Sequence, residues 1–244
     1  MTEKVVKVCG LKTKEAAEVA IENGASLLGM ILVPGRARTI DDESAKEIVQ
    51  LCAEKRSKKG SKIQTSTELI KLVKSLDIQG PEWFEAVSKC IVENGPFAVG
   101  VFRNQSLEDV LAKSRELNLD IVQLHGSENV DEFVNSLNVP IMPRFVLNKP
   151  GFENALTTHK FLMPLLDSEA GGEGKLIDWN DAATFGKDMK GRYLLAGGLN
   201  PENVVNALAV EGCCGVDVSG GVETDGIKDN CKIEAFIHNA IQSM

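Results

Sequence analysis

The sequence lacks long apolar runs. No stretch reaches the roughly 18 apolar residues of a membrane-spanning helix. The N-terminus carries only about five apolar residues before charge returns, fewer than the 7–15 of a signal-peptide core. We therefore expect a cytoplasmic protein that does not insert into a membrane.

The sequence also lacks cysteine motifs. Its six cysteines are scattered, with no CxxC pair and no histidine at zinc-finger spacing. Neither a disulfide framework nor a structural metal site is predicted, and most of these cysteines are expected to be buried small hydrophobic residues. Cys9 is set apart because of its position, described below.

Basic residues are in the minority. There are 27 Lys plus Arg against 35 Asp plus Glu, which gives a formal net charge of −8, and no basic stripe with interleaved aromatics is present. A chain of this charge repels nucleic-acid phosphates and anionic lipid. Nucleic acid and membrane surfaces are therefore not expected partners.

What is present is an alternation of short apolar runs with amphipathic helical stretches, which is typical of parallel βαβ units. Strands are predicted at 5–9, 27–33, 97–102, 121–125, 140–146, 161–167, 193–197 and 215–219. Helices are predicted at 13–23, 41–53, 106–117, 129–137, about 152–158, 180–187, 201–208 and 230–243. Several of these helices begin after a capping residue: Thr13, Asp41, Ser106 or Asn200, with Pro201 at a first helical position.

Eight strands, each followed by a helix, in 244 residues predict a single (β/α)₈ TIM barrel of the α/β class spanning residues 1–244. An open doubly wound sheet is the alternative, but it would show a GxGxxG turn after its first strand, where this chain reads CGLKTKE.

Residues 54–96 interrupt the alternation of strands and helices, because the segment is much longer than an ordinary connection. We interpret it as a helical insertion between helix 2 and strand 3, at the N-terminal end of the barrel. Its first part, KRSKKGSKIQTST, is polar and basic, so we expect residues 55–67 to be mobile and replaceable by a short Gly/Ser linker.

Reactive groups in a (β/α)₈ barrel lie at the C-terminal ends of strands. Cys9, His125 and Asp167 end predicted strands, and Asp217 lies near the end of the last one. A thiol and a carboxyl from different strands facing one mouth favour proton-transfer chemistry, and His125 is a further candidate for proton transfer or hydrogen bonding.

Glycines end the last two strands, where barrels commonly bind phosphate through backbone amides. Gly197 and Gly198 close one strand, and Ser219, Gly220 and Gly221 close the other. A phosphorylated substrate is predicted, with the helix that Pro201 opens adding its N-terminal amides. Residues 171–174 (GGEG) are read as a mobile loop able to cover the mouth.

Two arginines, Arg36 and Arg38, follow the second strand in VPGRARTIDD. A guanidinium here could bind a second anionic group such as a carboxylate. The residues alone do not choose between the two arginines.

The chain resembles the phosphoribosylanthranilate isomerase family along nearly its whole length. The motifs that carry the resemblance are KVCGL, GRARTI, VGVFRNQ, DIVQLHG, LLDSEAGGEGKLIDW, LAGGLNPENV and GVDVSGGVE. The resemblance implies a barrel without cofactor that performs an Amadori rearrangement of N-(5-phosphoribosyl)anthranilate in tryptophan biosynthesis. No metal is expected, and the protein is expected to be a monomer or homodimer.

The resemblance also implies roles for individual residues. Cys9 is the general base, Asp167 the general acid, and Arg38 the ligand of the anthranilate carboxylate. Gly198, Ser219, Gly220 and Gly221 hold the phosphate. Asp217 orients either the anthranilate amine or Cys9, and this choice stays open. Two departures from the family pattern are Glu173, in place of the usual Thr or Ser, and the long segment 54–96.

Two other classes remain as alternatives. Indole-glycerol-phosphate synthase or an aldose–ketose isomerase on the same barrel would share the phosphate glycines, but the former would show a lysine and glutamates at strand ends, whereas Lys7 is expected to point along its strand. A non-catalytic phosphate-binding barrel would need no acid–base pair. Turnover of the substrate separates these alternatives.

Overall fold

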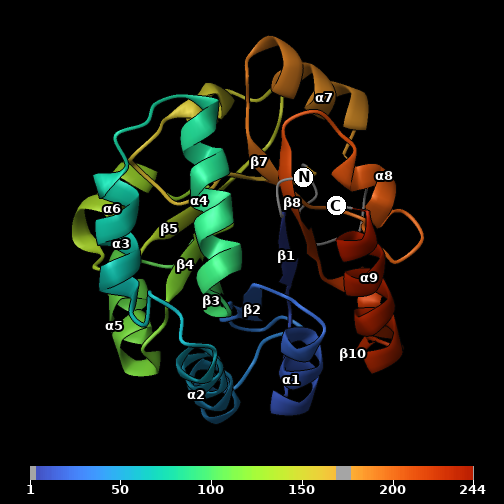
Figure 1. Cartoon of the computed structure of the whole chain (residues 1–244). Coiled ribbons are helices and arrows are strands. Elements are labelled where there is room, and N and C mark those ends of the chain that lie inside the picture. Colours follow the sequence, from blue (N-terminus) through green and yellow to red (C-terminus); the bar gives the residue numbers. More distant parts are fainter. Residues whose placement is uncertain (1–3, 169–176, 244) are drawn as a thin grey trace.

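The computed structural model describes residues 4–168 and 177–243, and eight parallel strands in it close into a barrel (Figure 1). Each strand pairs with the next in sequence, and β8 pairs with β1. The predicted TIM barrel is confirmed, with a strand in each of the eight predicted runs. The strands are β1 (Val5–Val8), β2 (Leu27–Ile31), β3 (Phe97–Phe102), β4 (Ile121–Leu124), β5 (Ile141–Phe145), β6 (Leu165–Leu166), β7 (Tyr193–Leu195) and β8 (Cys213–Val218).

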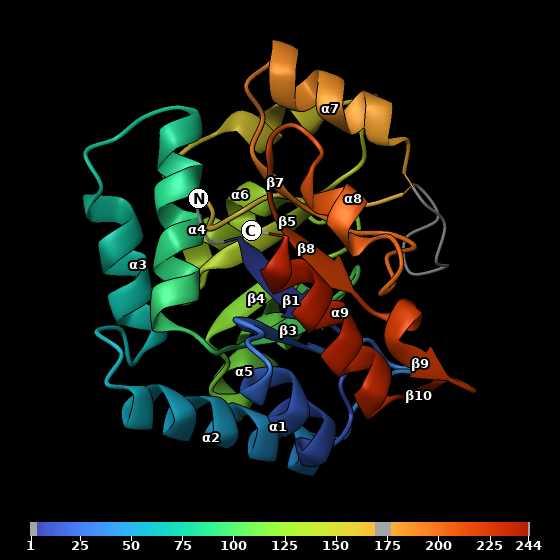
Figure 2. The same ribbon diagram turned by 45° about the vertical axis from the view of Figure 1, so that its right-hand side comes forward.

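Helices surround these strands, as the two views in Figures 1 and 2 show. In the described residues they are α1 (Lys14–Glu22), α2 (Asp42–Lys59), α3 (Ser66–Ser75), α4 (Pro81–Asn94), α5 (Leu107–Leu117), α6 (Val130–Ser136), α7 (Trp179–Asp188), α8 (Val204–Leu208), α9 (Asn230–Gln242) and two short 3₁₀ turns, η1 (Phe152–Leu156) and η2 (Gly220–Val222).

Side-chain caps fix where several helices begin. The oxygens of Thr13, Asp41 and Ser106 each accept a hydrogen bond from a backbone N–H in the first turn of α1, α2 and α5. Such a bond satisfies a donor that the helix itself leaves unpaired. These three predicted starts are confirmed.

The predicted start after strand seven is wrong. Asn200 Oδ1 accepts hydrogen bonds from the N–H groups of Glu202 and Asn203, both at 3.0 Å, so this stretch is a turn. Helix α8 begins only at Val204 and is five residues long. The asparagine side chain bonds to the backbone two and three residues on and delays the helix, so Pro201 opens no helix toward the mouth.

The barrel strands are buried on both sides, because side chains of one set fill the interior and those of the other pack under the helices. All six residues of β3 are buried, including Phe97 and Phe102 at 0% exposure. Burying each such phenyl ring stabilises the fold by about 1.5–3 kcal/mol. Four charged or amide side chains interrupt these otherwise mostly apolar strands: Lys7, Gln123, Arg144 and Asp217.

Helix α4 packs against the N-terminal ends of the barrel strands. It contacts β1 and β8, and Ser88 Oγ donates a hydrogen bond to the carbonyl of Cys214 at 3.0 Å. Trp83 and Phe84 are buried, and the Phe84 ring lies 6.4 Å from that of Phe161. Helix α4 therefore lies away from the C-terminal mouth of the barrel.

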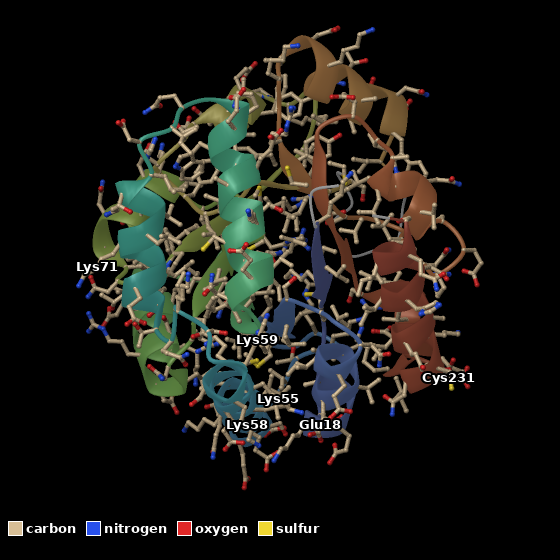
Figure 3. All side chains as sticks on the ribbon, viewed as in Figure 1. Glu18, Lys55, Lys58, Lys59, Lys71 and Cys231 are labelled. Carbon is tan, nitrogen blue, oxygen red and sulfur yellow. The ribbon has the colours of Figure 1, made fainter. Side chains whose placement is uncertain are left out.

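The expectation that residues 55–67 are mobile is wrong. Helix α2 continues to Lys59, and Arg56 is 2% exposed. Its guanidinium makes two hydrogen bonds of 2.7 and 2.8 Å to the carboxylate of Asp120. Figure 3 labels the neighbouring lysines Lys55, Lys58 and Lys59 at this end of α2. Because basic residues dominate this run, its composition did not indicate that one of them, Arg56, faces inward from a helix.

Candidate active site

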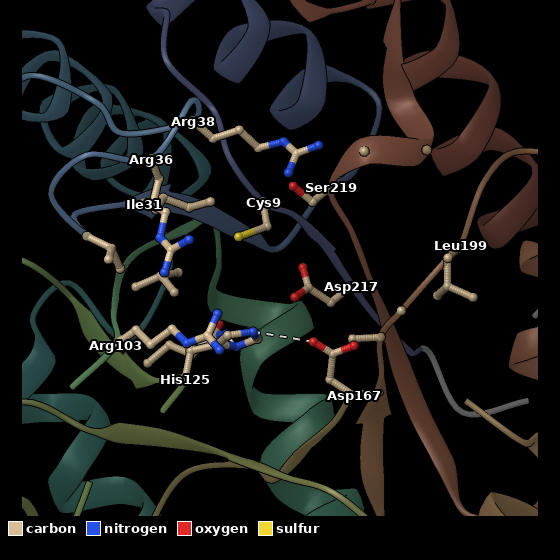
Figure 4. Close-up of a pocket in the computed structure, with 18 of the residues that line it drawn as sticks. Cys9, Ile31, Arg36, Arg38, Arg103, His125, Asp167, Leu199, Asp217 and Ser219 are labelled. Carbon is tan, nitrogen blue, oxygen red and sulfur yellow. Dashed lines mark hydrogen bonds and ion pairs between the residues drawn. The ribbon is translucent and has the colours of Figure 1, made fainter. Parts of the chain in front are cut away.

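A cavity of about 810 Å³ opens at the C-terminal ends of the strands (Figure 4). All the site residues predicted from the sequence line it: Cys9, Arg36, Arg38, His125, Asp167, Gly198, Asp217, Ser219, Gly220 and Gly221. The barrel brings these residues together because parallel strands end on one side. The predicted loop 171–174, with Glu173, lies outside the described residues.

Cys9 follows β1, and its backbone N–H donates to the carbonyl of Val218 at 2.8 Å. The thiol is held against β2, where a Cβ added at Gly29 would lie 2.7 Å from Sγ. Only glycine at this position of β2 leaves room for the thiol. Burial raises the pKa of Cys9, while the nearby ammonium group of Lys7 works in the opposite direction.

Lys7 lies inside the barrel and has no exposed surface. Its Nζ is 2.9 and 3.0 Å from the two carboxylate oxygens of Asp217, its neighbour in the pairing of β1 with β8. Burial by itself would lower the pKa of Lys7, but the charges of Asp217 and Cys9 outweigh it and raise that pKa. Lys7 does not line the cavity at the mouth, but its charge lies next to the candidate base.

Asp167 is 5% exposed and accepts a hydrogen bond from the backbone N–H of Ser168 at 2.7 Å. Its Oδ2 lies 3.3 Å from Nε2 of His125 and 3.8 Å from Nε of Arg144. Gln123 Nε2 lies 3.1 Å from the other ring nitrogen of His125. An amide that donates there leaves the ring N–H on Nε2, facing the Asp167 carboxylate.

The glycines after β7 and β8 form a cradle of backbone. Gly197 and Gly198 have φ of +88° and +64°, a conformation that favours glycine. A Cβ added at Gly221 would lie 1.7 Å from the carbonyl oxygen of Leu199, so the two loops touch. Ser219 Oγ is buried and has no hydrogen-bond partner among the described residues. Such a concave group of amides with a free hydroxyl suits a phosphate.

Arg38 has a partner that the sequence did not predict. Glu223, in the hairpin of β9 (Glu223–Thr224) and β10 (Ile227–Lys228) seen in Figure 2, accepts two 2.8 Å hydrogen bonds from Nε and Nη2 of Arg38. Lys228 Nζ lies 2.7 Å from the same carboxylate. Burial opposes the charge on Glu223, but these bonds outweigh it and lower the pKa of Glu223.

The pair with Glu223 fixes the orientation of Arg38. It occupies the Nε–Nη2 edge of the guanidinium and, among the residues that the structure describes, leaves Nη1 free to donate. The guanidinium lies beside the phosphate cradle, since a Cβ added at Gly220 would be 3.0 Å from Nη2.

Sequence reasoning missed several residues of the site. Gln123 and Arg103 line the cavity, and Lys7 lies beside it. The Oε1 atom of Gln123 is buried with no hydrogen-bond partner in the part of the chain that the structure describes. A polar residue inside an otherwise apolar strand was the available signal for Lys7 and Gln123.

Within residues 4–168 and 177–243, no group of three or more His, Cys, Asp or Glu is placed to hold a metal ion. None of the helices described is both long enough and apolar enough to cross a membrane.

The chain is similar to known proteins over its full length. The family model of N-(5'-phosphoribosyl)anthranilate (PRA) isomerase matches residues 52–239. N-(5'-phosphoribosyl)anthranilate isomerase of Wickerhamomyces anomalus is 48% identical, covering 98% of this chain and all of the relative, and that of Candida albicans is 47% identical, covering 96% of each.

Solved structures agree. Phosphoribosyl anthranilate isomerase of Thermotoga maritima has a TM-score of 0.69 and 29% identity, covering 98% of each chain. A phosphoribosyl anthranilate isomerase solved with reduced 1-(o-carboxyphenylamino)-1-deoxyribulose 5-phosphate has a TM-score of 0.66 and 28% identity, also covering 98% of each chain.

Proposed function

The chain belongs to the N-(5'-phosphoribosyl)anthranilate isomerase family, and we propose that Cys9 and Asp167 are the general base and general acid of its reaction. The activity is that of the family: N-(5-phosphoribosyl)anthranilate is converted into 1-(2-carboxyphenylamino)-1-deoxyribulose 5-phosphate in tryptophan biosynthesis. Because the chain belongs to this family, we no longer consider the two alternatives, another enzyme on the same barrel and a non-catalytic phosphate-binding barrel.

The reaction begins with two proton transfers, one from an acid and one to a base. Asp167 gives a proton to the ring oxygen of the ribosylamine, and the nitrogen lone pair forms a protonated imine as the ring bond breaks. The Cys9 thiolate then removes the proton from C2, and the electron pair moves toward the imine carbon and nitrogen. The resulting enol becomes the ketone when C1 gains a proton and the C2 hydroxyl loses one. The protonated imine accepts the electrons, so one acid and one base suffice.

The observation that carries this assignment is the placement of the two groups around the phosphate cradle. Cys9 follows β1 and Asp167 follows β6, while the cradle glycines follow β7 and β8, which lie between those strands in the barrel. A substrate whose phosphate rests on the glycines therefore presents its sugar carbons between the thiol and the carboxyl. Figure 4 shows both side chains pointing into the cavity.

Fluorescence gives the direct test of activity. Freshly made phosphoribosylanthranilate should be consumed by the purified chain at a rate proportional to its concentration, and added chelator should leave that rate unchanged. A chain that binds the reduced product analogue but consumes no substrate would contradict the proposed acid–base chemistry.

The pH dependence of kcat/KM tests Cys9 as the base. Because burial raises the pKa of Cys9, the thiolate fraction of the free enzyme should still be increasing at alkaline pH, and kcat/KM with it. Lys7 favours the thiolate, so Lys7→Met should move this rising limb to higher pH. A profile that is flat from pH 7 to 10 in the wild-type enzyme would argue against a thiol base.

Arg38 remains our candidate for the anthranilate carboxylate. Arg38→Ala should weaken binding of the reduced product analogue by about 10-fold or more, because a charge-assisted hydrogen bond is lost. An analogue that has phenyl in place of the carboxyphenyl group should be barely affected. Equal losses in calorimetry would place Arg38 at the phosphate instead.

For its surroundings we propose a cytoplasmic enzyme without nucleic-acid partners that is a monomer or homodimer. The acidic net charge of −8 supports the absence of nucleic-acid partners. A solved relative from Thermotoga maritima is described as monomers generated from a dimeric isomerase, so both states occur on this fold. Light scattering on the eluted protein distinguishes them.

A further inference from the structure

Arg144 is a cation of the barrel that the reaction described above does not use. It lies in β5 and pairs in register with Leu165 of β6. Side chains alternate between the two faces of a strand, so Arg144 and Asp167, two residues beyond Leu165, face the same side of the sheet. The side chain of Arg144 is only 9% exposed. Because a guanidinium does not lose its proton in a protein, a full positive charge lies next to the candidate acid.

The guanidinium of Arg144 contacts the residues that hold this acid. Its Nε lies 3.8 Å from Oδ2 of Asp167, and its Nη2 donates a hydrogen bond to the carbonyl of Ser168. The backbone N–H of Ser168 in turn donates to Oδ1 of Asp167 at 2.7 Å. From β4, Nε2 of His125 lies 3.3 Å from the same Oδ2 (Figure 4). Groups from three neighbouring strands therefore surround one carboxyl.

Arg144 lies behind Asp167 as seen from the cavity. In the part of the chain that the structure describes, Asp167 and His125 line the cavity and Arg144 does not. A substrate in the cavity therefore meets the carboxyl and not the guanidinium. Any effect of Arg144 on the reaction has to pass through the residues that it contacts, Asp167 and Ser168.

The charge of Arg144 matters at one moment of the reaction. While Asp167 carries its proton, the carboxyl is neutral and its attraction to the guanidinium is weak. When the proton passes to the ring oxygen of the ribosylamine, the O–H bond of Asp167 breaks and its electron pair stays on the carboxylate. Arg144 keeps all its protons and stabilises this negative charge, which forms at a side chain that is 5% exposed. An interaction that strengthens only as the proton leaves lowers the barrier without tightening substrate binding.

We propose that Arg144 is a positioning residue for the general acid: it orients the Asp167 carboxyl through Ser168 and stabilises the carboxylate that remains after the proton transfer. This role rests on the proposed function, since it requires Asp167 to give the proton. It adds a residue of β5, a strand in which the sequence predicted no site residue.

Three substitutions separate the charge of Arg144 from its hydrogen bond. Methionine removes both, glutamine keeps a donor for the Ser168 carbonyl, and lysine keeps the charge. Arg144→Met and Arg144→Gln should each lower kcat by about 10- to 100-fold, less than the loss of a donor that touches the reacting atoms. Arg144→Lys should keep kcat within about 5-fold of the wild type. In calorimetry all three should bind the reduced product analogue within about 3-fold of the wild type.

A double-mutant cycle links the effect to the acid. In an Asp167→Asn background, Arg144→Met should change kcat by less than about 3-fold, because no negative charge then forms beside the guanidinium. Arg192→Gln is the matched control. Arg192 directly precedes β7, at the opposite end of the strands from the cavity, and its Nε lies 2.7 Å from Oε1 of Glu85. Losing this charge should leave kcat unchanged.

Thermal melts show which variants are folded, and if Arg144→Met is not, the comparison of Arg144→Gln with Arg144→Lys decides. A glutamine variant with wild-type kcat beside a lysine variant that has lost it would show that Arg144 only holds Ser168. The proposal is also wrong if no Arg144 variant changes kcat, or if the losses of Arg144→Met and Asp167→Asn multiply. In each of these cases the proposed function stands, provided that Asp167→Asn has lost turnover. An Asp167→Asn variant with wild-type turnover would overturn the proposed function instead.

Discussion

Cys9→Ser and Asp167→Asn should each lower kcat by at least about 100-fold, the smallest effect expected when a general base or acid is removed. Serine in place of the thiol is a far weaker base, and asparagine carries no transferable proton. Both substitutions keep the size of the side chain. Binding of the reduced product analogue should therefore stay within a few-fold of the wild type, and steady-state kinetics together with calorimetry measure the two quantities.

Cys90→Ser is a matched control for the thiol. Cys90 is also buried, at 7% exposure, but lies in α4, away from the cavity. The Cys90→Ser variant should fold and have the same kcat as the wild type. A Cys9 or Asp167 variant that keeps more than about a tenth of wild-type turnover would show that the proton transfer uses another group. For Asp167 the first group to examine is His125, whose Nε2 lies 3.3 Å away.

Much of the fold was predictable because each barrel strand is a short run of buried residues. The run FAVGVF of β3, for example, is apolar throughout and wholly buried. The hairpin of β9 and β10 was missed because its strands are two residues long and carry no hydrophobic period. The extent of α2 was missed because lysines on its exposed face dominate the composition around Arg56.

The site was predictable where topology alone decides it. Residues that end parallel strands meet at one mouth, so the sequence order was enough to bring Cys9, His125 and Asp167 to one cavity. Contacts that depend on the register between strands could not be predicted from the sequence. Lys7 meets Asp217 only because β1 pairs with β8 in the observed register, 210 residues apart in the chain. The pair of Arg38 with Glu223 likewise depends on where a loop and a hairpin fold back.

The second large effect concerns stability. Arg56→Met should lower the free energy of unfolding by about 3–5 kcal/mol, because it leaves the Asp120 carboxylate buried without its cation. In the wild type this guanidinium also donates to the carbonyls of Pro96 and Gln64, at 2.7 and 3.0 Å, and lies 5.0 Å from the centre of the Phe97 ring. One side chain thus joins α2, the loop after it and the start of β3. Urea unfolding followed by circular dichroism measures the loss.

Lys58→Met is the control, because Lys58 lies two residues along the same helix and is exposed. It should change the free energy of unfolding by less than about 0.5 kcal/mol. Arg56→Met combined with Asp120→Leu should recover part of the loss, since the unpaired charge is then absent. Replacing residues 55–67 with a Gly/Ser linker removes Arg56 as well and should destabilise the protein by at least as much. If that replacement unfolds at the wild-type urea concentration, the Arg56 ion pair contributes nothing to stability, and the segment is dispensable after all.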